Sequence, residues 1–151
     1  MAITRVHHHT FTVSDMDRSI HFYRDLLGLK IVGEGENYGT EQEHLNNVFG
    51  ARLRITSLRA AAGAGIELLE YLAPQGGRPV PADERSNDLL HWRTVLDAAD
   101  VEQFERNPAR RAVRFVSPGV VKDDGVPTLS FIDADGHEMQ LREGKAASKA
   151  P

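Results

Sequence analysis

The chain contains 151 residues, of which 40% are hydrophobic and 26% are charged, and its formal net charge is −4 at pH 7. This composition is typical of a folded globular domain and argues against a disordered chain, a membrane protein or a basic nucleic-acid binder. No cysteine is present, which excludes disulfides, a thiolate zinc site and a cysteine nucleophile. The N-terminal stretch lacks the apolar run of a signal peptide, so a cytosolic location is expected.

The first half of the sequence predicts a strand, a helix and three further strands. Residues 3–13 alternate as in a half-buried strand, with His8 on one face. Ser14 and Asp15 form a helix-start signal, and the helix that follows is expected to end at Gly28. Further strands are expected at residues 29–33, 52–58 and 66–72, with the polar segment 34–50 as a loop or a short irregular helix.

The second half repeats this order after a segment rich in proline, glycine and charge, residues 73–88, which is typical of a linker. Strands are expected at residues 89–96, 112–116, 128–133 and 138–142, with a helix at residues 97–106. An internal repeat of this kind predicts an α+β fold made of two βαβββ modules. The expected organisation is one domain over residues 1–143, with module one at about 1–72, the linker at 73–88, module two at 89–143 and a flexible tail at 144–151.

Polar residues occupy matched positions in the two predicted modules. His8 and His91 lie in the first strand of each module, and Glu67 and Gln140 lie in the last strand of each. Taken singly, such residues are more often solvated or hydrogen-bonded than bound to a metal, but their matched positions favour a shared role. Two imidazoles, a carboxylate and an amide oxygen suit Zn, Ni, Co, Mn or Fe(II).

Three stretches of the sequence resemble the vicinal oxygen chelate superfamily, which includes glyoxalase I, methylmalonyl-CoA epimerase, extradiol dioxygenases and fosfomycin- or bleomycin-resistance proteins. In the first stretch, HHTFTVSDMDRSIHFYRDLLGLKIVG, His8 stands seven residues before Asp15. The second, LLHWRTVLDAAD, contains His91, and in the third, FIDADGHEMQL, Gln140 stands seven residues after Asp133. The resemblance implies that the two modules form a cup-shaped, partly open β-barrel with helices outside, around a metal ion.

By the same resemblance, His8, Glu67, His91 and Gln140 are the expected ligands of a divalent metal of unknown identity. The implied function is a metal-dependent lyase or isomerase of the glyoxalase or epimerase type, in which the metal stabilises an enediolate or enolate and Glu67 transfers the proton. The residues expected to line the substrate pocket are Thr10, Tyr71 and Arg93. The superfamily usually has a carboxylate where this chain has Gln140.

Two alternative functions stay open. One is a ring-cleaving dioxygenase, against which Gln140 argues because such enzymes bind iron through two histidines and one carboxylate. The other is a non-catalytic small-molecule binding or resistance protein, against which the retained histidines argue. The expected partners are a small-molecule substrate and a second copy of the chain, with no nucleic acid and no membrane. Strand alternation places His7, His9 and His137 away from the expected ligands, and it places Glu138 on the ligand face without assigning it to the metal.

Overall fold

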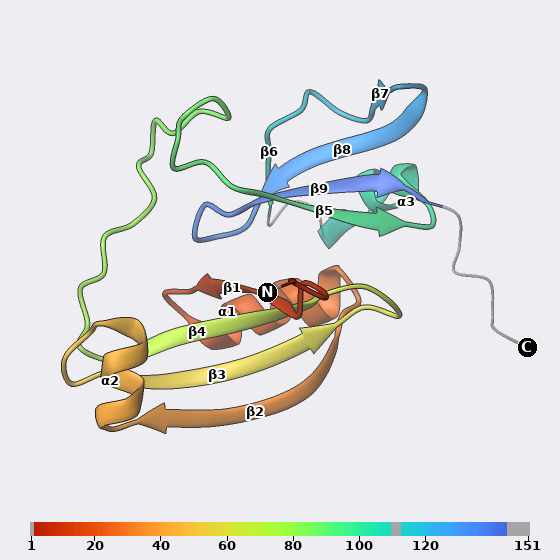
Figure 1. The fold of residues 1–151 in the computed structure, drawn as a ribbon. Helices are drawn as coiled ribbons and strands as arrows, with labels where there is room; N and C mark the ends of the chain where they lie inside the picture. Colours follow the sequence, from red (N-terminus) through yellow and green to blue (C-terminus); the bar gives the residue numbers. More distant parts are fainter. Residues whose placement is uncertain (1, 110–112, 145–151) are drawn as a thin grey trace, which may run out of the picture. The chain divides into compact units, whose positions relative to one another are not determined.

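The computed structural model of the protein describes residues 2–109 and 113–144. The chain divides into two compact units, one up to Arg78 and the other from Pro79 onward, and each is described by itself (Figure 1). The expected tail, apart from Gly144, and the start of the expected strand at 112–116 lie outside the described residues. Within those residues, no helix has the length and apolar character needed to cross a membrane.

Unit 1 is a four-stranded mixed sheet with its helices joined to the strand ends. Its elements are β1 (His8–Thr12), α1 (Met16–Ile20), the π-helical turn η1 (His21–Leu26), β2 (Lys30–Tyr38), α2 (Thr40–Asn46), β3 (Arg52–Arg59) and β4 (Gly65–Ala73). The strand order is β1-β4-β3-β2, in which β1 runs parallel to β4 and the other pairs are antiparallel. The first and last strands of the predicted module are therefore neighbours.

The helical segment α1–η1 covers the apolar face of this sheet. The side chain of Asp15 caps the helix by accepting a hydrogen bond from the backbone N–H of Arg18 at 3.0 Å. Tyr23 is fully buried and its ring stacks on Phe11 of β1, with ring centroids 6.1 Å apart. Because side chains alternate along a strand, the burial of Phe11 leaves His8 on the opposite face, away from the helix.

Unit 2 repeats this arrangement with shorter elements. They are β5 (Arg93–Ala98), α3 (Val101–Arg106), β6 (Arg114–Phe115), β7 (Val121–Asp123), β8 (Val126–Ile132) and β9 (Glu138–Glu143). The strand order is β5-β9-β8-β6, with β5 parallel to β9 and β7 paired to β8. Phe104 of α3 stacks on the fully buried Phe131 of β8, with ring centroids 5.0 Å apart, so α3 covers the apolar face of the sheet.

The predicted fold class is confirmed: the chain is α+β, with two mixed sheets and few helices, and neither sheet closes on itself. Residues 34–50 were expected to form a loop or a short irregular helix, and the short helix is present as α2, but the first part of this segment is strand. β2 extends to Tyr38, which pairs with Arg52, and α2 follows. As an edge strand, β2 tolerates glycine and glutamate because one of its sides needs no partner strand.

Two further expectations in the second half were wrong. The strand expected at 89–96 begins only at Arg93, where its pairing with Glu138 of β9 starts, so His91 precedes the strand. The additional strand β7 was missed, although Asp124 and Gly125 form a two-residue turn between β7 and β8 with φ of 49° and 81°. An Asp-Gly pair is a standard signal for such a hairpin.

Candidate functional site

The polar face of unit 1 brings together the two metal ligands predicted there. Thr10 of β1 pairs in register with Glu67 of β4, and His8 lies two residues earlier on the same face as Thr10. His8 Nε2 and Glu67 Oε2 are 3.8 Å apart, and both side chains are partly exposed. Their proximity follows from the parallel pairing of β1 and β4, the first and last strands of the module.

Each member of this pair has a further neighbour. The hydroxyl of Ser57 on β3 donates a hydrogen bond to Glu67 Oε1 at 3.4 Å. The Nδ1 atoms of His7 and His8 lie 2.7 Å apart, so one ring donates to the other. His7 was expected to face away from the site, and this was wrong because it precedes β1, where strand alternation does not apply.

Of the predicted pocket residues in unit 1, Thr10 lies beside Glu67, while Tyr71 lies four residues farther along β4 on the same face. The Tyr71 hydroxyl accepts a hydrogen bond from the amide of Asn46, the last residue of α2, at 2.8 Å. This bond ties α2 to the polar face of the sheet.

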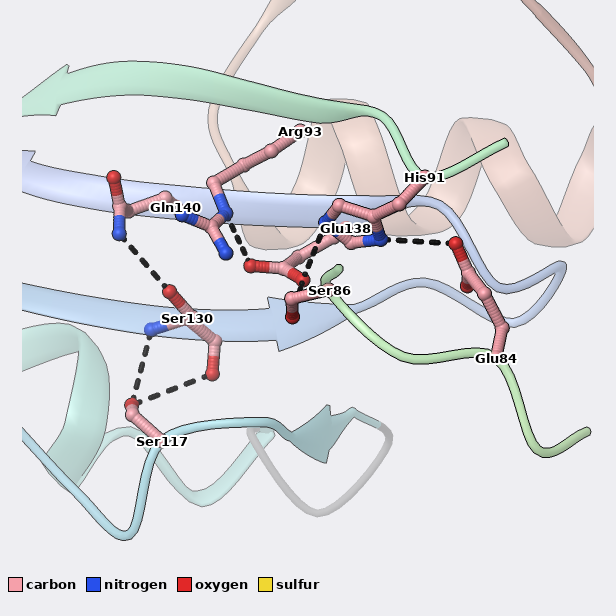
Figure 2. Close-up of polar contacts among 8 residues, drawn as sticks. All are labelled: Glu84, Ser86, His91, Arg93, Ser117, Ser130, Glu138 and Gln140. Carbon is pink, nitrogen blue, oxygen red and sulfur yellow. Dashed lines mark hydrogen bonds and ion pairs between the residues drawn. The ribbon is translucent and has the colours of Figure 1, made fainter. Parts of the chain in front are cut away.

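In unit 2, His91 lies between two carboxylates, as Figure 2 shows. Its Nδ1 is 2.9 Å from Glu84 Oε1, and its Nε2 is 3.1 Å from Glu138 Oε2. The His91 side chain is 11% exposed, and the buried Nε2 makes no hydrogen bond within the part of the chain that the structure describes. A carboxylate on Nδ1 and an open Nε2 resemble the arrangement in which an outer carboxylate orients a metal-ligating histidine.

Glu138 is the most deeply buried carboxylate near His91, with 3% of the side chain exposed. It pairs with Arg93 through Oε1, and the hydroxyl of Ser86 donates to its Oε2 at 3.3 Å (Figure 2). A buried carboxylate is costly unless it is neutralised and hydrogen-bonded, and these two residues supply both conditions. The predicted pocket residue Arg93 is therefore engaged by Glu138.

Gln140 lies on the same face of β9 as Glu138, but it has different partners. Its amide nitrogen donates to the hydroxyl of Ser130 on β8 at 3.2 Å. Ser117 in turn accepts a hydrogen bond from the backbone N–H of Ser130 at 3.1 Å (Figure 2). No contact joins Gln140 to His91 in the described residues, so unit 2 places the predicted ligand pair on one face without bringing the two side chains together.

The donor groups suit a divalent ion of the Zn, Mn or Fe(II) type, since imidazole and carboxylate are the ligands that such ions accept. In each unit the expected histidine ligand has a nitrogen close to a carboxylate oxygen, His8 to Glu67 and His91 to Glu138. Within residues 2–109 and 113–144, however, no three histidine, aspartate or glutamate side chains cluster around one point. In unit 2 the reason is visible, because Glu84 and Glu138 contact opposite nitrogens of His91.

Three residues of the network around His91, namely Glu84, Ser86 and Glu138, were not predicted to belong to it. Glu138 carried a signal, because it alternates with Gln140 along the last strand. Glu84 and Ser86 carried none, since they lie in the segment interpreted as a linker. That segment packs onto unit 2: a Cβ at Gly136, in the turn between β8 and β9, would lie 3.0 Å from Val80 Cβ.

The sequence pattern of the Glyoxalase/Bleomycin resistance protein/Dioxygenase superfamily matches residues 5–141. The chain belongs to this superfamily. Among curated relatives, the metallothiol transferase FosB of Staphylococcus epidermidis is 26% identical over 146 residues, which cover 95% of this chain and 84% of FosB. At this level the relationship supports a metal-dependent enzyme without specifying its reaction.

Two solved structures of the superfamily share the fold. A glyoxalase family protein from Bacillus cereus superposes with a TM-score of 0.79 at 19% identity, covering 95% of each chain. The fosfomycin resistance protein FosX from Listeria monocytogenes, in a complex with Mn(II) and sulfate, superposes with a TM-score of 0.59 at 15% identity, again covering 95% of each chain. FosX thus shows that this fold can hold a divalent metal.

Proposed function

We propose that the chain is a metal-dependent lyase or isomerase that removes and returns a proton beside the carbonyl of a small oxygenated substrate. The observation that carries the proposal is the pair of His8 and Glu67 on the open face of unit 1, 3.8 Å apart. The resemblance implies His8, Glu67 and His91 as ligands, with a fourth, oxygen ligand on β9 that is expected at Gln140. The proposal extends to a homodimer, as the resemblance implies, and to a cytosolic location, as expected from an N-terminal stretch without the apolar run of a signal peptide.

When bound, a divalent ion would act as a Lewis acid and lower the energy of the enediolate or enolate. Glu67 would be the catalytic residue that accepts and returns the proton. Its surroundings support this role. The carboxylate is partly exposed, so a substrate can reach it, and the Ser57 hydroxyl orients it through Oε1, leaving Oε2 toward His8.

The test is deuterium uptake at the carbon beside the carbonyl, measured by NMR in D2O with a panel of 2-hydroxycarbonyl compounds, glutathione hemithioacetals and coenzyme A thioesters. The wild-type chain loaded with Mn(II) or Zn(II) should incorporate deuterium into one class of compound. Glu67→Gln should slow this uptake by about 10²- to 10⁴-fold, the usual contribution of a general base.

Glu70→Gln is the matched control. Glu70 lies on the same strand as Glu67 but on the other face of the sheet, and it pairs with Arg54 of β3. It should leave deuterium uptake unchanged. A Glu67→Gln variant that retains its metal and its full exchange rate would remove the role proposed for Glu67.

The FosB relative is a metallothiol transferase and favours a second candidate, the transfer of a thiol, for which we propose an epoxide as the acceptor. In this reaction a thiolate sulfur attacks an epoxide carbon, the C–O bond breaks and the alkoxide takes up a proton. The thiol must come from a co-substrate because the chain has no cysteine. Consumption of glutathione or free cysteine in the presence of fosfomycin, with no deuterium exchange on the carbonyl panel, would favour this candidate.

A further inference from the structure

Glu138, which no pattern in the sequence assigned to the metal, lies closer to His91 than Gln140 does. In the register of β5 and β9, Arg93 pairs with Glu138 and Val95 pairs with Gln140. His91 lies just before β5, on the Arg93 side of this register. Two strand residues span about 7 Å, so Gln140 is one full pleat farther from His91 along the sheet.

The contact between His91 and Glu138 requires a cation or a proton between them. If the ring of His91 is neutral and its Nδ1–H donates to Glu84, then Nε2 carries a lone pair that faces the carboxylate of Glu138 at 3.1 Å. Two acceptors at this distance repel each other. A divalent ion held by His91 and Glu138 would replace this repulsion by attraction to both groups, since imidazole and carboxylate are ligands that such ions accept.

We infer that Glu138, rather than Gln140, supplies the oxygen ligand of unit 2 to the metal. This inference rests on the proposed function, because it names a ligand of the ion that the proposed function requires. Arg93 and Ser86 then hold the carboxylate from outside the ligand shell, and Glu84 holds the ring of His91. The amide of Gln140 stays bound to Ser130.

The inference explains the amide at the end of the superfamily pattern. The chain keeps a second carboxylate besides Glu67, but the carboxylate has moved by two residues along β9, from the position of Gln140 to that of Glu138. Both positions lie on the polar face of the sheet because side chains alternate along the strand. A carboxylate is also a stronger ligand than an amide for a hard divalent ion.

The experiment is a titration of the full chain, stripped by a chelator, with Co(II). Affinity is measured by calorimetry, and the ligand shell is followed by the visible absorption of the bound ion. Glu138→Gln should weaken Co(II) binding at least tenfold and should change the visible spectrum. Tenfold is the lower end of the loss seen when a residue that only hydrogen-bonds a metal ligand is mutated. Gln140→Leu should leave both unchanged.

Glu143→Gln, at the exposed end of the same strand, is the matched control and should behave as the wild type. If Glu138→Gln does not fold, as judged by circular dichroism, then Glu138→Asp keeps the buried charge. Because Glu138→Asp draws the carboxylate back by one methylene, it should still change the Co(II) spectrum.

Three results would overturn the inference. A spectrum that changes in Gln140→Leu but not in Glu138→Gln would make Gln140 the ligand. A Glu138→Gln or Glu138→Asp variant with the wild-type spectrum would place Glu138 outside the ligand shell, or show that it serves only as an ion-pair partner of protonated His91. A wild-type chain that binds neither Co(II), Mn(II) nor Zn(II) would contradict the proposed function as well.

Discussion

At the scale of single residues, the neighbours of each histidine decide what it can do. His8 and His91 occupy matched positions in the two halves, yet their surroundings differ. His8 is 38% exposed and lies beside another histidine, whereas His91 is 11% exposed and lies between two carboxylates. The two rings therefore differ in how firmly they are oriented, and His91 is the better preorganised of the two.

A surface cluster on the helical segment offers a test of local electrostatics. The pKa of Asp25 is lowered from 3.8 to about 2, mainly by the guanidinium of Arg24 and to a smaller extent by His21. Because the pKa is lower in the folded chain than in the unfolded chain, this interaction stabilises the folded state above pH 3.8 and is lost as the pH falls toward 2.

In a titration of the Asp25 carboxyl carbon followed by NMR, the wild-type midpoint should therefore lie near 2. In Arg24→Gln, which removes the larger cause, the midpoint should move up toward the ordinary aspartate value. An unchanged midpoint in that variant would show that Arg24 does not hold Asp25 in solution.

At the scale of elements, edge strands and turns account for what the sequence pattern missed. The turn between β8 and β9 depends on Gly136, which has a φ of 100°. Asp133 supports this turn, since its carboxylate accepts hydrogen bonds from the backbone N–H groups of Asp135 and His137, each at 2.9 Å. Val80, from the segment interpreted as a linker, packs against the same turn.

Gly136→Ala should therefore lower the free energy of unfolding by about 1–3 kcal/mol, the usual cost of a side chain in a left-handed conformation, with the contact to Val80 adding to it. Urea denaturation followed by circular dichroism measures this change. Gly77→Ala is the control, because a Cβ there would meet no atom within 4 Å, and it should change stability by no more than about 0.5 kcal/mol. Equal effects of the two substitutions would contradict the close packing of Val80 on the turn.

At the scale of the whole molecule, the resemblance to the superfamily implies that His8 and His91 bind the same ion. His8→Ala and His91→Ala should each abolish the binding of the same ion, so that elemental analysis finds about one metal per chain in the wild type and none in either variant. His44→Ala, in the exposed α2, should keep the metal. Loss of only half of the bound metal in each variant would indicate two separate sites.

The same ion should also stabilise the folded chain, because a ligand that binds only the folded state adds about 2.7 kcal/mol at a concentration 100 times its dissociation constant. The thermal midpoint of the wild type should rise with added Mn(II) or Zn(II), and that of His91→Ala should not. A rise of equal size in both proteins would show that the stabilising ion binds elsewhere.

Local and periodic features were within reach of the sequence alone. Short-range geometry determines the helix start at Asp15, the alternation that separates His8 from Phe11, and the repeat of the two halves. The α+β class and the superfamily could therefore be predicted from the sequence. The proximity of His8 and Glu67 could also be predicted, since the resemblance places both residues in one ligand set.

Only the tertiary structure decided which side chains meet around His91. The start of β5 at Arg93, the approach of Glu84 and Ser86, and the burial of Glu138 depend on how a proline- and glycine-rich segment packs on the sheet. That packing has no periodic signature, because it is set by contacts between residues far apart in the sequence. The burial of Glu138 likewise depends on its partner Arg93. Strand alternation predicts the face on which Arg93 lies, but not that it contacts Glu138.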